Sequence, residues 1–173
     1  MKVIILAGGK GSRISEYTKK IPKPMIQIFG KTILEHIIQI YSKQLYKDFY
    51  ILTGYKGNII KKYFDKYKLE KNLYKFKNLE HKLQIHFIPT GINTMTGGRI
   101  RKLSKIIKDD NFMVTYGDGL ANVNLKKLEK FHYQHKKIAS VTAVRPMSRY
   151  GILDLHGNTV SSFKEKLKLN YGW

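Results

Sequence analysis

The chain has 173 residues, a length typical of one domain, and 42% of them are hydrophobic, which is enough for a substantial core. It contains no cysteine, which excludes a disulfide framework and thiolate zinc sites. No apolar run approaches the roughly 18 residues of a membrane span, and the apolar stretch at 3–7 is too short for a signal peptide. These features predict a cytoplasmic protein without membrane association.

The 33 Lys and Arg residues against 12 Asp and Glu give a formal net charge of +21, which favours negatively charged partners. Lysine is spread through nearly every segment, and there is no basic tail or RGG tract. We therefore expect nucleic acid to bind only non-specifically, at low salt. A basic nucleic-acid-binding module remains the alternative that this charge leaves open.

Strand-like and helix-like patterns alternate along the chain. The pattern at 33–45 has apolar residues at helical spacing, whereas 2–7 is a continuous apolar run typical of a buried strand. The expected strands are 2–7, 48–53, 83–90, 111–116 and 138–144, the expected helices are 33–45, 57–67, 99–107 and 125–135, and a hairpin is expected at 151–163.

This alternation predicts an α/β fold, namely a Rossmann-like, doubly wound, mostly parallel sheet with helices on both faces and a single domain over 1–173. Ligands of such folds bind beyond the carboxyl ends of the strands. Gly8 and Asp118 each follow such an end. The chain stops at "FKEKLKLNYGW" without a closing helix or strand, which indicates a C-terminally truncated domain.

The first expected strand runs into the glycine-rich turn "LAGGKGSR" at 6–13. A dinucleotide fingerprint fails because Ile14 occupies the position of its third glycine, and a P-loop ending at "GKT" fails because Met25 occupies the position of its first glycine. Glycines let a backbone approach a ligand closely, and successive N–H groups can cradle phosphate oxygens. Arg13 adds a fork of donors suited to phosphate. A plain turn with a solvated arginine is the alternative.

Two further polar residues are candidates for phosphate chemistry. Lys23 lies between Pro22 and Pro24, which stiffen an extended segment and hold the lysine at a fixed place. A rigid lysine a few residues after a phosphate-binding turn is what a site for the α-phosphate of a nucleotide would need. Asp118 lies between two glycines at a strand end, and Mg²⁺ often takes only one or two protein carboxylates together with substrate phosphates. A solvated lysine and a turn-forming aspartate would explain the same residues without a ligand.

The loop "TGINTMTGGR" at 90–99 is rich in glycine and hydroxyl groups and leads into an expected helix. Its backbone groups could read the edge of a base, and the helix start would present N–H donors. Late in the chain, Glu165 and Lys166 of "FKEK" follow a strand and are a weak signal by themselves.

Taken together, these stretches resemble the sugar-nucleotide pyrophosphorylases, a family of nucleotidyltransferases. The resemblance covers essentially the whole chain, through "LAGGKGSRISEYT", the "KP" lysine, "TYGDG" and "SFKEK". The stretches "TGYKG" and "TMTGGR" are more characteristic of the branch that uses CTP and glucose 1-phosphate.

The resemblance implies a nucleotidyltransferase fold of the glycosyltransferase-A-like type. It also implies Mg²⁺-dependent transfer from CTP to α-D-glucose 1-phosphate, giving CDP-glucose and pyrophosphate for surface polysaccharides such as O-antigen. A homo-oligomer is implied for the full-length protein. Because the attacking phosphate is already an anion, positioning and charge neutralisation suffice, and no catalytic triad is expected.

The resemblance also implies roles for individual residues. Arg13, Lys23 and Asp118 would be catalytic, with Asp118 binding the metal. Glu165 and Lys166 would hold the sugar phosphate, and Thr96, Gly97, Gly98 and Arg99 would help to select cytosine. The remaining substrate-binding residues would be Leu6, Ala7, Gly8, Gly9, Gly11, Ser12 and Gly117.

The sequence departs from the family in two places. Leu167 stands where the family has a proline after the Glu-Lys pair. Further strands and a second metal-binding aspartate of the family are missing, so activity of the truncated chain is left open. The sequence is also compatible with a thymidylyl- or uridylyltransferase and with an inactive fragment that binds CTP.

Overall fold

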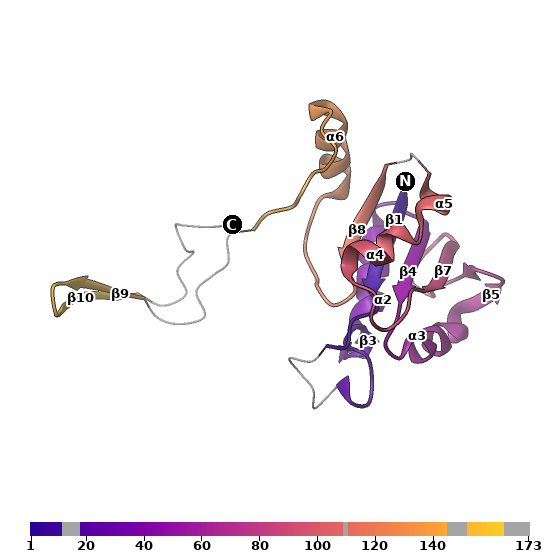
Figure 1. Ribbon diagram of the computed structural model, residues 1–173, viewed down its shortest axis with the longest axis horizontal. Coiled ribbons are helices and arrows are strands. Elements are labelled where there is room, and N and C mark those ends of the chain that lie inside the picture. The colour runs from indigo at the N-terminus through magenta and orange to yellow at the C-terminus, as the bar shows by residue number, and fades with distance from the viewer. Residues whose placement is uncertain (12–17, 109–110, 145–151, 165–173) are drawn as a thin grey trace. The chain divides into compact units, whose positions relative to one another are not determined.

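The computed structural model describes residues 1–11, 18–108, 111–144 and 152–164. The chain divides into two compact units, Met1–Lys126 and Lys127–Trp173 (Figure 1). The first unit contains a six-stranded sheet with helices, and the second contains a hairpin. None of the described helices is long and apolar enough to cross a membrane.

The sheet of the first unit has the strand order β5-β6-β7-β4-β1-β8. The strands are β1 (Lys2–Ala7), β4 (Asp48–Thr53), β5 (Lys68–Glu70), β6 (Leu73–Tyr74), β7 (Leu83–Pro89) and β8 (Phe112–Tyr116). The neighbours from β7 to β8 pair in parallel, and the two short strands β5 and β6 at one edge pair antiparallel. The mostly parallel sheet expected from the alternating pattern is therefore confirmed.

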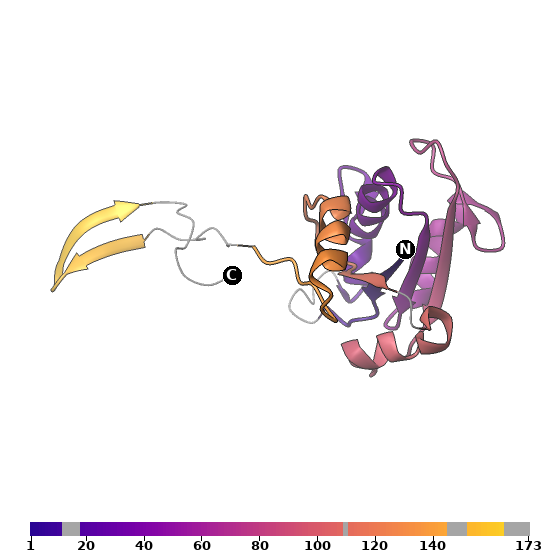
Figure 2. The same cartoon turned by 90° about the horizontal axis from the view of Figure 1, so that it is seen from above.

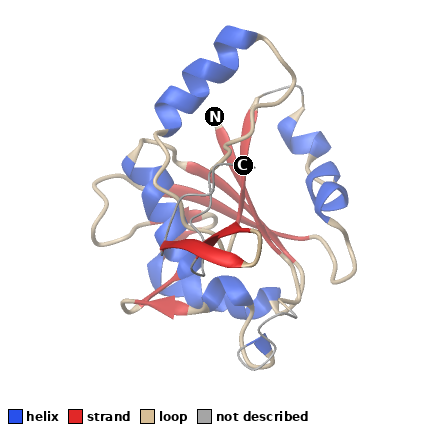
Figure 3. Cartoon of the chain, turned by 90° about the vertical axis from the view of Figure 1, so that its left-hand side faces the viewer, coloured by secondary structure: helices blue, strands red, loops and turns tan. Residues whose placement is uncertain are grey.

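Helices cover both faces of this sheet, which is why its central strands are apolar on both sides. On one face, Val3 and Ile5 of β1 belong to the larger core cluster with α2 (Ile33–Lys43) and α3 (Gly57–Phe64). On the other face, Ile4 and Leu6 pack with Leu103 and Ile107 around α4 (Thr96–Arg101) and α5 (Ser104–Ile107). Figures 2 and 3 show the strands with helices on opposite sides.

The helices lie close to their expected positions. The Thr32 side chain accepts a hydrogen bond from the Glu35 N–H at 3.1 Å and so caps α2. The helix expected at 57–67 is α3 followed by the 3-10 helix η3 (Asp65–Tyr67). The helix expected at 99–107 begins earlier, at Thr96, and is interrupted at Lys102–Leu103, where Leu103 enters the second core cluster.

Three short elements are found among the described residues between β1 and α2. They are the 3-10 helix η2 (Lys23–Met25) and the antiparallel pair β2 (Gln27–Ile28) and β3 (Lys31–Thr32). The extended segment expected around Lys23 is therefore wrong in part, because Pro24 occupies an early position in a 3-10 turn and tolerates it.

Helix α6 (Leu125–His135) begins in the first unit and continues into the second. The expected hairpin is confirmed as β9 (Ile152–His156) and β10 (Thr159–Lys164), with Gly157 at a positive φ of 59° in the turn. The strand expected at 138–144 is wrong. A strand needs a partner for its backbone N–H and C=O groups, and no described strand pairs with this segment.

Candidate functional site

A cleft of about 470 Å³ opens beyond the carboxyl ends of β1 and β8, in the first unit. The glycine turn, the 3-10 helix η2, the loop before α4 and the residues after β8 all contribute to its wall. The lining residues are Leu6, Ala7, Gly8, Gly9, Lys10, Gly11, Lys23, Pro24, Ile92, Asn93, Thr94, Met95, Thr96, Arg99, Tyr116 and Asp118.

Most of the candidate residues within the described chain are brought together here. Gly117 connects two lining residues, and Gly97 and Gly98 lie in the first turn of α4. Candidates Ser12, Arg13, Glu165 and Lys166 lie outside the described residues. The structure thus unites the glycine turn, Lys23, the start of α4 and Asp118, which are far apart in the sequence.

Lys23 and Asp118 form an ion pair across the cleft, with 2.7 Å between Nζ and Oδ2. Both side chains are about one-third exposed, at 38% and 32%, so they remain accessible to a ligand. The backbone at Lys23 is held in place because the next two residues, Pro24 and Met25, are buried. The Gly117 N–H donates to the Leu6 carbonyl at 2.9 Å and so extends the pairing of β8 with β1 up to the residue before Asp118.

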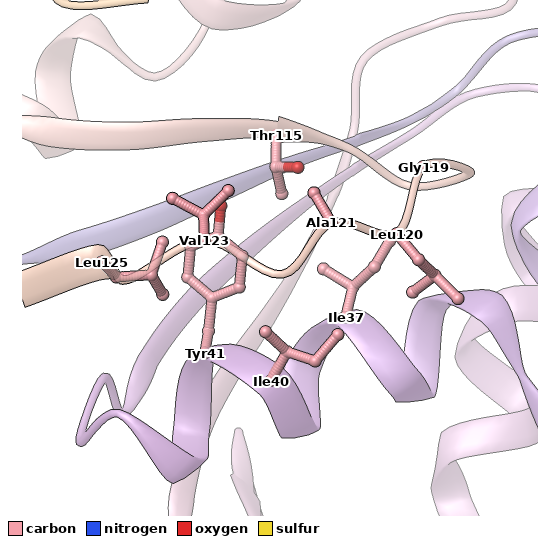
Figure 4. A pocket seen from close by; sticks show the side chains of 9 residues that line it. All are labelled: Ile37, Ile40, Tyr41, Thr115, Gly119, Leu120, Ala121, Val123 and Leu125. Atoms are coloured by element: carbon pink, nitrogen blue, oxygen red, sulfur yellow. The ribbon is translucent and has the colours of Figure 1, made fainter. Parts of the chain in front are cut away.

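The loop after Asp118 is anchored on α2. Figure 4 shows its side chains and those of α2 converging on a small cavity of about 40 Å³. The Gln44 side chain adds two hydrogen bonds, donating to the Val123 carbonyl at 3.1 Å and accepting from the Leu125 N–H at 2.8 Å. Asp118 is therefore held between a strand and an anchored loop. The cavity is lined by Ile37, Ile40, Tyr41, Thr115, Gly119, Leu120, Ala121, Val123 and Leu125.

Two positions of the turn are occupied by glycine for different structural reasons. Gly11 has a φ of +66°, and a Cβ there would lie 2.8 Å from Cγ2 of Thr18 and 3.3 Å from Cβ of Lys23. Gly9 has open space around the position of a Cβ. Gly11 is thus required by the fold of the turn, whereas Gly9 leaves room beside the cleft.

Arg99 is buried, with 5% of its surface exposed, although it also lines the cleft. Its guanidinium donates to the carbonyl oxygens of Gly8 at 3.0 Å, Gly91 at 2.9 Å and Thr53 at 3.3 Å. It also donates to the Thr90 hydroxyl. Burial lowers the pKa of Arg99 from its usual value. Its donors thus face protein acceptors, and a role of Thr96–Arg99 in the selection of cytosine stays a prediction.

Some residues of the cleft were not singled out in the sequence. Tyr116 is 59% exposed, and Met95, in the loop before α4, is 81% exposed. The signal for Tyr116 was its place directly before the Gly117-Asp118 pair. The signal for Met95 was that an apolar side chain stands among glycines and hydroxyl residues, where it is not part of a pattern that would bury it in the core.

The donor set fits one divalent cation shared with a ligand. Within the described part of the chain, no three His, Cys, Asp or Glu side chains gather to hold a metal by themselves. Asp118 offers one accessible carboxylate in the cleft wall. Mg²⁺ commonly binds through one or two carboxylates and completes its shell with water and substrate phosphates. Asp118 fits such a site provided that the ligand carries phosphate.

A strand-end cleft lined by a glycine turn, a lysine and one carboxylate is typical of α/β proteins that bind nucleotides. A family model described as nucleotidyl transferase matches residues 2–170. The chain therefore belongs to the nucleotidyl transferase family.

Individual relatives are similar over nearly the whole chain. The glucose-1-phosphate cytidylyltransferase of Salmonella typhimurium is 44% identical over 97% of this chain and 70% of that protein. The probable glucose-1-phosphate cytidylyltransferase of Bacillus subtilis is 41% identical, over 96% of this chain and 69% of that protein. Among solved structures, HddC from Yersinia pseudotuberculosis complexed with GMP-PN has a TM-score of 0.62 at 27% identity, covering 96% of this chain and 70% of that one.

Proposed function

We propose that this chain transfers a cytidylyl group from CTP to α-D-glucose 1-phosphate, giving CDP-glucose and pyrophosphate. The observation that carries the proposal is the Lys23–Asp118 pair in a glycine-lined cleft, in a chain 41–44% identical to cytidylyltransferases. A lysine, backbone N–H groups and one metal-binding carboxylate suit the neutralisation of a triphosphate.

In the proposed reaction, a phosphate oxygen of the sugar phosphate forms a bond to the α-phosphorus of CTP. The bond from the α-phosphorus to the bridging oxygen breaks, and pyrophosphate leaves. The attacking oxygen is ionised at neutral pH, so no side chain has to remove a proton. The protein's task is then to align the two phosphates and to neutralise their charge.

Lys23 would neutralise the α-phosphate, since its ammonium group lies in the cleft wall on a buried turn. The backbone from Gly8 to Gly11 would cradle the triphosphate together with Ser12 and Arg13. Asp118 would hold Mg²⁺, which supplies additional positive charge to the phosphates when bound. Glu165 and Lys166 would hold the sugar phosphate.

The base would be selected at the loop before α4 and at the start of that helix, where Met95 and Thr96 line the cleft. A thymidylyl- or uridylyltransferase differs from this proposal only in the base and sugar that the same cleft accepts. The nucleotide preference therefore has to be measured rather than assumed.

The test is pyrophosphate release with glucose 1-phosphate, Mg²⁺ and each of CTP, UTP, dTTP, GTP and ATP. We expect CTP to be preferred, and we expect Lys23→Ala and Asp118→Ala each to lower turnover by about 10²–10⁴-fold, since each removes charge stabilisation. Lys20→Ala, which removes an exposed lysine just before Lys23 that does not line the cleft, is the matched control.

Preference for UTP or dTTP would replace the proposal with a related sugar nucleotidyltransferase. If none of these nucleotides supports pyrophosphate release, while calorimetry still detects CTP binding, the chain is a fragment that binds CTP without turnover. The net charge of +21 supports a second candidate, a nucleic-acid-binding module. Tight binding of RNA or DNA that persists at physiological salt would favour it over the enzyme.

A further inference from the structure

Three parallel strands of the first unit end around one guanidinium group. β1 is followed by Gly8, β4 ends at Thr53, and β7 is followed by Thr90 and Gly91. The Arg99 side chain donates hydrogen bonds to an oxygen atom at each of these three ends. Within the described chain its acceptors are carbonyl and hydroxyl oxygens, and no carboxylate pairs with it.

We propose that Arg99 is a positioning residue for the nucleotide, acting through the peptide that joins Gly8 to Gly9. The inference rests on the proposed function, because it assigns the orientation of a backbone N–H group that would contact phosphate. Arg99 itself would not contact the reacting atoms.

The first step of the argument is the Gly8 carbonyl. It accepts from Arg99 Nη2 at 3.0 Å and from the Tyr55 N–H at 3.2 Å, so both of its lone pairs are engaged. A trans peptide is planar, with its C=O and N–H pointing in opposite directions. Fixing the Gly8 carbonyl toward Arg99 therefore directs the Gly9 N–H away from Arg99. Gly9 lines the cleft and has open space beside it.

The second step is the room made for the guanidinium. A Cβ at Gly8 would lie 2.1 Å from Nη1 of Arg99, and a Cβ at Gly54 would lie 2.6 Å from the same atom. These two glycines therefore form a slot that the guanidinium fills. Arg99 explains why Gly8 lacks a side chain, whereas a Cβ at Gly54 would also lie 2.7 Å from the Gly8 carbonyl oxygen and 2.8 Å from that of Gly91.

The third step is the fork geometry of arginine. Nη2 reaches Gly8 while Nη1 reaches Gly91 and Thr53, so one side chain ties the glycine turn to the loop that begins at residue 90. A lysine carries one ammonium group on a flexible stem and cannot bridge these acceptors in the same plane. Arg99→Lys would keep the charge and lose the alignment.

The test compares Arg99→Lys with Arg101→Lys, the matched control at an exposed arginine on the same helix. CTP affinity is measured by calorimetry, folding by circular dichroism, and the Gly9 amide by ¹⁵N–¹H NMR. We expect Arg99→Lys to weaken CTP binding by about tenfold or more and to shift the Gly9 amide resonance, since charged hydrogen bonds are lost. Arg101→Lys should leave both unchanged.

Thr90→Val is the milder variant, because it removes only a hydroxyl that accepts from Arg99 and donates to the Thr53 carbonyl at 2.7 Å. We expect it to fold and to weaken CTP binding by about threefold to tenfold, again with a shift of the Gly9 amide. It keeps the proposal testable if Arg99→Lys fails to fold.

Unchanged CTP affinity together with an unchanged Gly9 amide, in either folded variant, would overturn the proposal. Lowered thermal stability with normal CTP affinity would also overturn it, since Arg99 would then have a purely structural role. If the wild-type chain binds no nucleotide, the proposed function fails. The Gly9 amide in the variants still reports whether Arg99 directs this peptide.

Discussion

Gly8→Ala is the substitution for which the structure gives the sharpest expectation. The new methyl group would lie 2.1 Å from Nη1 and 2.4 Å from Cζ of Arg99, against an ordinary contact distance of 3.4 Å or more. A flexible arginine on the surface would move aside at little cost. Arg99 is only 5% exposed and is held by oxygen atoms on three sides, so it can move aside only by breaking these hydrogen bonds.

Moving the guanidinium by more than an ångström would break its bonds to the Gly8 and Gly91 carbonyls, now 3.0 and 2.9 Å long. A hydrogen bond to a charged group contributes about 1.5–3 kcal/mol, so the loss of two lowers the free energy of unfolding by about 3–6 kcal/mol. For a unit of this size, that corresponds to a decrease in the melting temperature of about 10–20 °C.

Thermal and urea unfolding, followed by circular dichroism, measure this loss. Gly9→Ala is the matched control, because open space surrounds its new methyl group and its stability should change by less than about 1 kcal/mol. The double variant Gly8→Ala/Arg99→Met should be less destabilised than the sum of the two single variants, since the clash disappears with the guanidinium. Equal stability of Gly8→Ala and Gly9→Ala would refute the reasoning.

Three further outcomes are expected. Lys23→Ala should strengthen Mn²⁺ binding to the nucleotide-free protein by about twofold to fivefold, because an exposed ion pair such as that of Lys23 with Asp118 contributes up to about 1 kcal/mol. Paramagnetic broadening of the Asp118 amide measures the Mn²⁺ affinity, and a lower affinity in the variant would contradict the prediction. Gln44→Ala should lower the free energy of unfolding by about 1–3 kcal/mol in a urea titration, because the Leu125 N–H and a loop carbonyl lose their partners; an unchanged midpoint would show that water replaces them. Burial and nearby lysines lower the pKa of His81 from its usual 6.5, so the unfolded chain binds a proton at this histidine more readily than the folded chain, and stability falls as the pH decreases below about 6.5. His81→Gln should make that decline less steep, and an equally steep decline would exclude His81 as its source.

The sequence predicts the centre of the fold well because burial leaves a strong pattern there. β1 and β4 have the expected bounds, since both faces of each strand are apolar. The short strands β5 and β6 leave no such pattern in two or three residues each. The segment 138–144 shows the converse limit, because its apolar alternation is suitable for a strand while pairing depends on a partner elsewhere in the chain.

The candidate site was predictable only where a general rule of the fold applies. Gly8 and Asp118 follow strands of one parallel sheet, so the rule on carboxyl ends brings them to one edge. The burial of Arg99 had no sequence signal, because a buried arginine on a short helix looks like any solvated one. The residues around Arg99 come from three loops that meet only in the folded state. The need for a glycine at position 54 likewise becomes visible only when these loops are together.

The position of β1 between β4 and β8 has a consequence for folding. Val3 is aligned with Phe49 on one side and with Met113 on the other, so β1 obtains its second neighbour, β8, only after most of the first unit has been synthesised. Contacts between such distant segments require the closure of long loops and slow the rate of folding. On the ribosome, the apolar run of β1 would remain without β8 until that strand emerges, and chaperones that bind short hydrophobic segments would find it throughout that interval.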